Sequence, residues 1–268
     1  MTDTPVVLFE EEGPVTILTL NRPAVLNALN SAIFTALTEC LDRARRTPAT
    51  RALVITGSGD RAFCAGADLN ELSGLDTDAA YRVLSRGQGV LRAIERAPFP
   101  VIAAVNGVAL GGGFELALAC TFAVVARKAT LGLPETGLGL MPGYGGTQRL
   151  ARAIGPARAA HVMLTGHRID ADSAYASGIT PVPPVDGDVR GTAAELARTI
   201  ATRGPRAVRA VLTALRGGAD TGLDAALAHE TALAAQLTSG TEAAEGITAF
   251  TQRRTPVFAD ITHPEEPS

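Results

Sequence analysis

The segment from Ala97 to Phe114 runs for 18 residues without a charged side chain, and it constrains the fold more than any other stretch. A helix that spans a membrane needs about 20 apolar residues, so this length is at the lower limit. Pro98, Pro100, Asn106 and four glycines interrupt the run, and lipid would leave their broken backbone hydrogen bonds unsatisfied. We therefore expect a buried strand, a turn and a buried helix within an α/β domain, and no membrane partner.

Apolar patterns on both sides of this segment alternate between the periods of strands and helices. Short apolar or alternating runs predict strands at residues 6–9, 15–20, 52–56, 101–105 and 122–126. Apolar residues three and four positions apart predict helices at residues 31–46, 81–96, 113–119, 146–154 and 157–164, the first of them capped by Asn30 or Ser31.

The C-terminal third of the chain has a different pattern. Prolines and a glycine at residues 181–187 mark a break, and residues 189–254 beyond it are alanine-rich with helical spacing throughout. We therefore divide the chain into an α/β core, residues 1–190, and a helical C-terminal region, residues 191–268.

Charge and cysteine content exclude several classes of protein. The 268 residues carry 27 acids against 24 bases, a net charge of −3, and the densest basic stretch is only residues 43–46. Binding through nucleic-acid phosphates requires a basic surface, so we expect no nucleic-acid partner. Three cysteines without paired spacing, and an acidic N-terminus that contains Pro5, predict a reduced, cytoplasmic protein without a signal peptide. We expect no metal site, because metal-ligand spacing is absent from the four histidines, His161, His167, His229 and His263.

Two glycine clusters follow strand patterns. Residues 57–62 (GSGDRA) formally match a dinucleotide-binding fingerprint, but residues 61–67 lack the helical period that such a site needs. The second cluster, Gly111 to Gly113, opens an apolar helix. Its backbone N–H groups and the helix dipole would favour a developing negative charge. The alternative is that these glycines only allow close packing of helix and strand.

Two glutamates and one small-residue loop are candidates for chemistry. Glu115 lies in the first turn of the glycine-led helix, where a capping role is the alternative. Glu135 is the only charged residue in the run 131–143, so we expect a desolvated carboxyl with a raised pKa, or else an exposed turn residue. The loop at residues 62–69 could contact a ligand through its backbone. Cys64 within it has no recognisable base beside it, and we expect a core residue.

Together these segments resemble the enoyl-CoA hydratase/isomerase family, also called the crotonase family. The resemblance runs from about Val15 to Phe258 and depends on several motifs in the same order. The motifs are residues 20–23 (LNRP), 27–30 (NALN), 62–68 (AFCAGAD), 104–116 (AVNGVALGGGFEL), 134–135 (PE), 142–150 (PGYGGTQRL) and a weaker tail at 246–258.

The resemblance implies a fold and an assembly. The fold class is α/β, a crotonase-like ββα spiral core followed by a helical C-terminal trimerisation region. The implied assembly is a homotrimer or a dimer of trimers.

The resemblance also implies a substrate and a mechanism. An acyl-CoA thioester would bind with its carbonyl oxygen between the backbone N–H groups of Ala65 and Gly112, and the loop Ala65, Gly66, Ala67 and Asp68 would line its path. Glu115 and Glu135 match the two catalytic glutamates of family hydratases, which implies hydration of 2-trans-enoyl-CoA to 3-hydroxyacyl-CoA. Coenzyme A would be part of the substrate, with no separate cofactor.

Some features leave alternatives open. A 2-enoyl/3-enoyl-CoA isomerase needs one glutamate, other relatives cleave, cyclise or hydrolyse acyl-CoA esters, and a binding module could keep the fold without catalysis. Many relatives carry a lysine where this chain has Ala24 and Val25, so contacts to the coenzyme A phosphates could instead come from Arg22, Arg253 or Arg254. We expect residues 69–84 and the helices after Thr165 to shape the acyl pocket.

Overall fold

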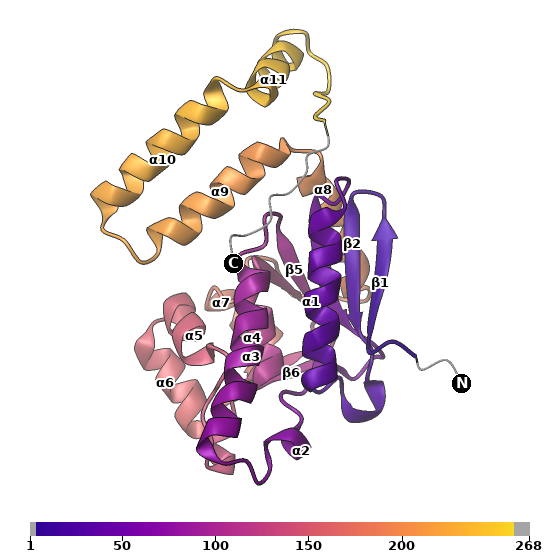
Figure 1. The fold of residues 1–268 in the computed structure, drawn as a ribbon, viewed down its shortest axis with the longest axis vertical. Helices are drawn as coiled ribbons and strands as arrows, with labels where there is room; N and C mark the ends of the chain where they lie inside the picture. Colours follow the sequence, from indigo (N-terminus) through magenta and orange to yellow (C-terminus); the bar gives the residue numbers. More distant parts are fainter. Residues whose placement is uncertain (1–3, 260–268) are drawn as a thin grey trace.

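The structure, a computed structural model, describes residues 4–259 and contains two mixed β-sheets surrounded by helices (Figure 1). The five-stranded sheet has the order β1-β2-β3-β5-β7, and β1 and β2 form an antiparallel hairpin while the other pairs are parallel. Its strands are β1 (Val7–Glu12), β2 (Val15–Leu20), β3 (Ala52–Gly57), β5 (Val101–Val105) and β7 (Phe122–Val125). The sequence predicted all five, because buried strands of a parallel sheet are near-continuous apolar runs.

The second sheet is made of much shorter strands. It has the order β4-β6-β8-β9, comprising β4 (Ala62–Cys64), β6 (Val108–Leu110), β8 (Thr130–Gly132) and β9 (Ile169–Asp170). The sequence predicted none of them, since two or three residues are too few to show a period. A long strand, a short strand and a helix follow one another repeatedly along the chain, which is the expected ββα order.

Helices lie between the strands along the chain and follow the last of them. They are η1 (Pro23–Val25), α1 (Ser31–Arg46), α2 (Leu69–Leu72), α3 (Thr77–Glu95), α4 (Gly112–Ala119), η2 (Glu135–Leu138), α5 (Gly146–Ile154), α6 (Pro156–Thr165) and α7 (Ala171–Ala176). Asn30 caps α1 as predicted, accepting a hydrogen bond from the Ile33 N–H at 3.0 Å. α3 begins four residues before its predicted start because Asp76 caps it through the Ala79 N–H at 2.7 Å. Its exposed first turn carries no apolar signal.

The segment that constrained the fold lies at the centre of the molecule. Residues 97–114 form β5, β6 and the first turn of α4. α4 buries every residue except Leu118, which explains why its sequence is apolar on all faces. Within residues 4–259, no helix has the length and apolar character needed to cross a membrane.

Four helices make up the C-terminal region, α8 (Val189–Ala201), α9 (Pro205–Gly218), α10 (Leu223–Thr238) and α11 (Thr241–Thr251). α8 packs against β2, β3, β5 and β7, so the division at residue 190 assigns to the helical region a helix that covers the core. The α9–α10 hairpin extends away from the sheets (Figure 1). Its chain reversal and the later break occur at Gly222 and Gly240, which precede α10 and α11.

Candidate active site

Glu115 is buried inside the core, with only 1% of its surface exposed. Its Oε1 atom accepts hydrogen bonds from the backbone N–H groups of Tyr144, at 2.8 Å, and Gly146, at 2.6 Å. Glu115 therefore does not cap its own helix and instead contacts a turn 29 to 31 residues later. Burial raises the pKa of Glu115 to about 7, although both N–H bonds and the charge of Arg149 oppose this shift.

The three glycines before Glu115 are each required for a different reason. Gly111 has a left-handed φ of +50°, and a Cβ there would lie 3.1 Å from Glu135 Oε1. A Cβ on Gly112 would lie 2.9 Å from the ring of Tyr144. A Cβ on Gly113 would collide with the backbone carbonyl of Cys64. Close packing therefore explains Gly113, whereas Gly111 and Gly112 border the candidate site.

Glu135 lies at the start of η2 and is partly buried. Burial raises its pKa, which favours the desolvated carboxyl over the exposed turn residue, the two alternatives that the uncharged run 131–143 left open. Its Oε2 atom is inaccessible to solvent and has no hydrogen-bond partner among the residues that the structure describes. A buried carboxyl oxygen without a donor favours the protonated form.

The structure brings the two glutamates to the same place. The charge of Glu135 contributes to the raised pKa of Glu115. Glu135 faces Gly111, directly before α4, and Glu115 lies one turn into that helix. The two carboxyl groups therefore lie near the N-terminus of α4, close enough for the charge of Glu135 to act on Glu115.

The loop at residues 65–68 lies beside this helix N-terminus. The Ala65 N–H donates to Leu26 O at 3.0 Å, so this amide is already used within the fold. Leu29 pairs with the same loop by donating to Gly66 O and accepting from the Asp68 N–H, each at 2.8 Å. In this parallel bridge the Ala67 N–H points away from Leu29.

Two backbone amides at this point are unpaired. Across residues 4–259, neither the Ala67 N–H nor the Gly112 N–H donates to another protein atom. Gly66 brings the loop close to α4, since a Cβ on it would lie 3.7 Å from Gly112 N. Of the two amides expected to bind the thioester oxygen, that of Gly112 is unpaired and that of Ala65 is bonded to Leu26 O, whereas the unpaired amide of the loop is that of Ala67.

Asp68 holds the loop in place from the other side. Its Oδ2 atom accepts from Nη1 and Nη2 of Arg22, both at 3.1 Å, and its Oδ1 accepts from the Asn70 N–H at 3.2 Å. Arg22 also donates to Ala28 O at 2.7 Å. The Asp68 carboxylate and the Arg22 guanidinium thus bind each other and hold the end of the loop.

Asn27 belongs to the motif at residues 27–30, but sequence reasoning assigned it no role. It is fully buried in a left-handed conformation with φ of 58°. Its side chain accepts from the Arg22 N–H and donates to Ser58 O and Ala62 O, each at 3.0 Å. The side chain therefore links three segments of the chain by hydrogen bonds. Asparagine adopts the left-handed conformation more readily than most residues, and this preference is the sequence signal that could have indicated its role.

Cys64 is a buried core residue of β4, as predicted. Burial raises the pKa of its thiol to about 12, so the reactive thiolate does not form near neutral pH. His161 and His167 lie near each other, with ring centroids 5.3 Å apart, whereas His263 lies outside the described residues. Over residues 4–259, no three His, Cys, Asp or Glu side chains are grouped to hold a metal ion.

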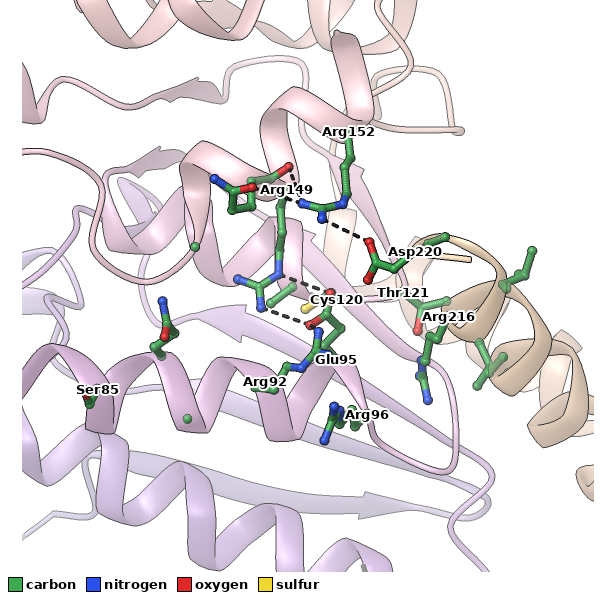
Figure 2. A pocket seen from close by; sticks show the side chains of 18 residues that line it. Ser85, Arg92, Glu95, Arg96, Cys120, Thr121, Arg149, Arg152, Arg216 and Asp220 are labelled. Atoms are coloured by element: carbon green, nitrogen blue, oxygen red, sulfur yellow. Dashed lines mark hydrogen bonds and ion pairs between the residues drawn. The ribbon is translucent and has the colours of Figure 1, made fainter. Parts of the chain in front are cut away.

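A cavity of about 770 Å³ is lined by residues of α3, α5 and α9 (Figure 2). Neither Glu115 nor Glu135 lines it, so it is distinct from the place where the two carboxyl groups meet. Arginines dominate its charged lining: Arg92, Arg96, Arg149, Arg152 and Arg216. Glu95 and Asp220 are the acids among the lining residues.

The fold and this site define an α/β protein in which two desolvated glutamates flank a helix N-terminus with unpaired amides. Such a site suits proton transfer beside a developing anion. The chain belongs to the enoyl-CoA hydratase/isomerase family, whose model matches residues 10–261. Its fold is the α/β crotonase fold, with two mixed sheets and C-terminal helices.

Individual relatives cover nearly the whole chain. This chain is 42% identical to the 2,3-dehydroadipyl-CoA hydratase of Escherichia coli, over 94% of this chain and 98% of the relative. The crotonyl-CoA hydratase of Syntrophomonas wolfei is 38% identical, over 92% and 95%. A crystal structure of an enoyl-CoA hydratase from Bacillus anthracis superposes with a TM-score of 0.90 at 38% identity, covering 94% of this chain and 98% of that one.

Proposed function

We propose that this protein hydrates 2-trans-enoyl-CoA thioesters to 3-hydroxyacyl-CoA. The observation that carries the proposal is the pair of desolvated glutamates beside the unpaired amides of Ala67 and Gly112. The hydratase names of the relatives described above support the same substrate class. Coenzyme A would enter as part of the substrate, and no separate cofactor is needed.

The two amides would form the oxyanion hole. Attack of water at C3 puts enolate character on the thioester oxygen, and two preorganised N–H groups stabilise that charge in a dry site. Loss of one such donor typically costs about 10²–10³ in rate. We assign the donors to Gly112 and Ala67 rather than to Gly112 and Ala65, because the Ala65 N–H donates to Leu26 O.

The two glutamates would divide the proton transfers. Ionised Glu115 accepts a proton from water as the water oxygen bonds to C3, and protonated Glu135 delivers a proton to C2. The pair starts with one proton on Glu135 and ends with one on Glu115, and transfer through solvent restores the first state. The partnerless Oε2 of Glu135 supports the protonated form, and the two N–H bonds to Glu115 support the ionised form.

Isomerisation of 2-enoyl and 3-enoyl thioesters is the alternative reaction. It moves one proton between carbons and needs only one carboxyl group. The presence of both glutamates at the same helix N-terminus favours hydration. A binding module without catalysis would have no reason to keep two desolvated carboxyl groups side by side.

We also propose that the protein is cytoplasmic and assembles as a homotrimer or a dimer of trimers. Large apolar side chains on the projecting helices support assembly, including Leu215, Leu223 and Phe250, which is 85% exposed. Two of the arginines considered for coenzyme A contacts are already engaged: Arg22 binds Asp68, and Arg254 binds Glu245. Arg253 is the candidate that we retain for the phosphates.

The test is loss of the ultraviolet absorbance of the conjugated enoyl thioester when the protein meets crotonyl-CoA. We expect rapid loss with wild type and at least a 100-fold slower rate for both Glu115→Gln and Glu135→Gln. Near-wild-type hydration by either variant would overturn the two-glutamate mechanism. No hydration by wild type, with conversion of a 3-enoyl-CoA to the conjugated isomer, would favour the isomerase.

A crystal structure with acetoacetyl-CoA tests the donor assignment independently. We expect the thioester oxygen within about 2.7–3.1 Å of the backbone nitrogens of Ala67 and Gly112. We expect Ala65 to keep its bond to Leu26. A thioester oxygen bound by the Ala65 amide would refute the assignment.

A further inference from the structure

We propose that Arg149 is a positioning residue for Glu115. It fixes the orientation of the Glu115 carboxylate and favours its ionised form, acting through the backbone of the turn at residues 144–146. Glu95 anchors Arg149 from the opposite side. The inference deepens the proposed function, since it concerns the glutamate that we assign as the base.

Every edge of the Arg149 guanidinium is used. Nη1 donates to Tyr144 O at 2.8 Å, while Nε and Nη2 donate to the two carboxylate oxygens of Glu95 at 3.3 and 3.0 Å. The Tyr144 residue that accepts from Arg149 through its carbonyl donates to Glu115 through its N–H. Arg149 is thus connected to the base through a single residue of backbone.

Glycines make this connection short. Gly145 has φ of +105°, and a Cβ on it would collide with Nη1 of Arg149. On the other side of the turn, a Cβ on Gly146 would lie 3.0 Å from Glu115 Oε1. Only main-chain atoms of the turn therefore separate the Arg149 guanidinium from the Glu115 carboxylate. A side chain on either Gly145 or Gly146 would not fit between them.

The pairing with Glu95 is partly buried and bidentate. Side-chain exposure is 13% for Arg149 and 28% for Glu95. Burial alone would raise the pKa of Glu95, but hydrogen bonds and charge from Arg149 and Arg92 outweigh it and lower the pKa. Bidentate pairing fixes the plane of the guanidinium, and hence the direction of Nη1 toward Tyr144.

The charged and titratable groups around Glu115 come from several elements. Arg149 from α5 favours its ionised form, and Glu135 from η2 opposes it. The Tyr144 hydroxyl and the Cys64 thiol stay neutral near pH 7, because burial raises the pKa of each group well above its ordinary value. Arg149 is therefore the cation that supports Glu115 among these neighbours, both by its charge and by holding the Tyr144 turn.

The cavity supplies a matched control. Arg149 and Arg152 both project from α5 into it, and Figure 2 shows Arg149 directed at Glu95 while Arg152 is directed at Asp220. The Arg152–Asp220 contact, at 3.1 Å, is exposed on both sides. Substitution of Arg152 removes an arginine from the same helix and the same cavity without touching the turn that binds Glu115.

The experiment compares Arg149→Met, Arg149→Lys, Glu95→Gln and Arg152→Met in the full-length protein. We expect Arg149→Met to lower kcat for crotonyl-CoA about 10- to 100-fold with little change in KM, because the base loses its orientation. The acidic limb of the pH profile of kcat/KM should move upward by about one pH unit. Arg149→Lys should retain the charge and recover much of the pH profile, and Arg152→Met should match wild type.

A second measurement separates this inference from the proposed function. The carboxyl carbon of Glu115, labelled with ¹³C and assigned by the signal missing in Glu115→Gln, can be titrated by NMR without turnover. The pH at the midpoint of this titration should be higher in Arg149→Met than in wild type and unchanged in Arg152→Met. An inactive wild type would overturn the hydratase proposal and leave this titration informative.

The inference is overturned if the Glu115 midpoint and the pH profile are the same in Arg149→Met and wild type. It is equally overturned if Arg152→Met shifts them as much as Arg149→Met does. If Arg149→Met does not fold, by circular dichroism, Glu95→Gln decides, because it weakens the anchor of Arg149 and leaves the arginine in place. A lower kcat with an acidic limb moved upward supports the inference, and any other result overturns it.

Discussion

Gly146 brings its backbone nitrogen to within 2.6 Å of the Glu115 Oε1 atom, a distance that is possible because the residue has no side chain. This contact joins the start of α5 to the first turn of α4. It makes the position of one buried carboxylate depend on a turn distant in sequence. A substitution that displaces this turn should therefore lower both the catalytic rate and the free energy of unfolding.

Gly146→Ala tests this dependence. The added methyl would lie 2.9 Å from Glu115 Cγ and 3.1 Å from Leu133 Cδ1, so the carboxylate has to move. We expect a loss of about 1–3 kcal/mol in the free energy of unfolding and a kcat about 10- to 100-fold lower. Urea denaturation and crotonyl-CoA hydration measure the two effects.

Gly89→Ala is the matched control for that substitution. Gly89 is exposed within α3, and a Cβ on it would meet nothing within 4 Å. We expect unchanged activity and stabilisation by about 0.5–1 kcal/mol, because alanine favours a helix interior. Wild-type kcat in Gly146→Ala would show that the turn does not control Glu115.

Protein stability should depend on pH through Glu115. Its pKa is 4.5 for an unperturbed carboxyl and about 7 in the folded protein, so the folded state binds more protons between these values. The free energy of unfolding therefore falls as pH rises from about 4.5 to 7, by about 3 kcal/mol from this group. Below pH 4.5 that stability is fully present, and above pH 7 it has been lost.

Glu115→Gln should remove this pH dependence. The amide carbonyl can still accept the N–H groups of Tyr144 and Gly146 but carries no charge. We expect the variant to be more stable than wild type at pH 8 and to show a flatter stability profile, measured by urea denaturation from pH 4.5 to 8. A variant less stable than wild type at pH 8 would indicate that the carboxylate is not destabilising there.

The Arg22–Asp68 pair should contribute more to stability than an exposed ion pair. Side-chain exposures are 21% for Arg22 and 14% for Asp68, and both side chains also bind backbone groups, Arg22 the Ala28 carbonyl and Asp68 the Asn70 N–H. Burial alone would raise the pKa of Asp68, but the hydrogen bonds and charge of Arg22 outweigh it and lower the pKa. We expect a coupling energy of about 1 kcal/mol from a double-mutant cycle with Arg22→Met and Asp68→Asn.

The exposed Arg43–Glu11 pair is the control for that cycle, and we expect its coupling to be below about 0.5 kcal/mol. The Arg22–Asp68 coupling should be present above the unperturbed pKa of the carboxyl, 3.8, and decline as pH falls through the lowered folded value. Equal coupling energies for the two pairs would contradict a special role for Asp68 in holding the loop.

The projecting helices should determine the assembly state. Phe250 on α11 is exposed, and such a side chain is unfavourable in water unless another surface covers it. We expect wild type to have the mass of a trimer or hexamer by light scattering and Phe250→Glu to have a smaller mass. Tyr81→Glu, on α3 and also exposed, should leave the mass unchanged. A monomeric wild type would refute the assembly.

The sequence predicted the five strands of the first sheet and α1 from local information, and it offered the desolvated environment of Glu135 as one of two alternatives. Apolar period, a helix cap and an uncharged run are properties of neighbouring residues, and burial follows from them. The motifs were sufficient to indicate the family, because their order along the chain is itself specific. These features required no knowledge of which distant segments meet.

Tertiary structure decided the rest. The short strands β4, β6, β8 and β9 have no period of their own and exist only because neighbouring strands pair with them. Ala65 and Ala67 are identical in type and two positions apart, and only the pairing with Leu29 and Leu26 determines which amide is free. Arg149 could not be connected to Glu115 from the sequence, because the hydrogen bonds that link them depend on how a turn folds around two glycines. Local patterns determine which residues are buried, and the direction of each backbone amide in the loop is set by contacts that form only on folding.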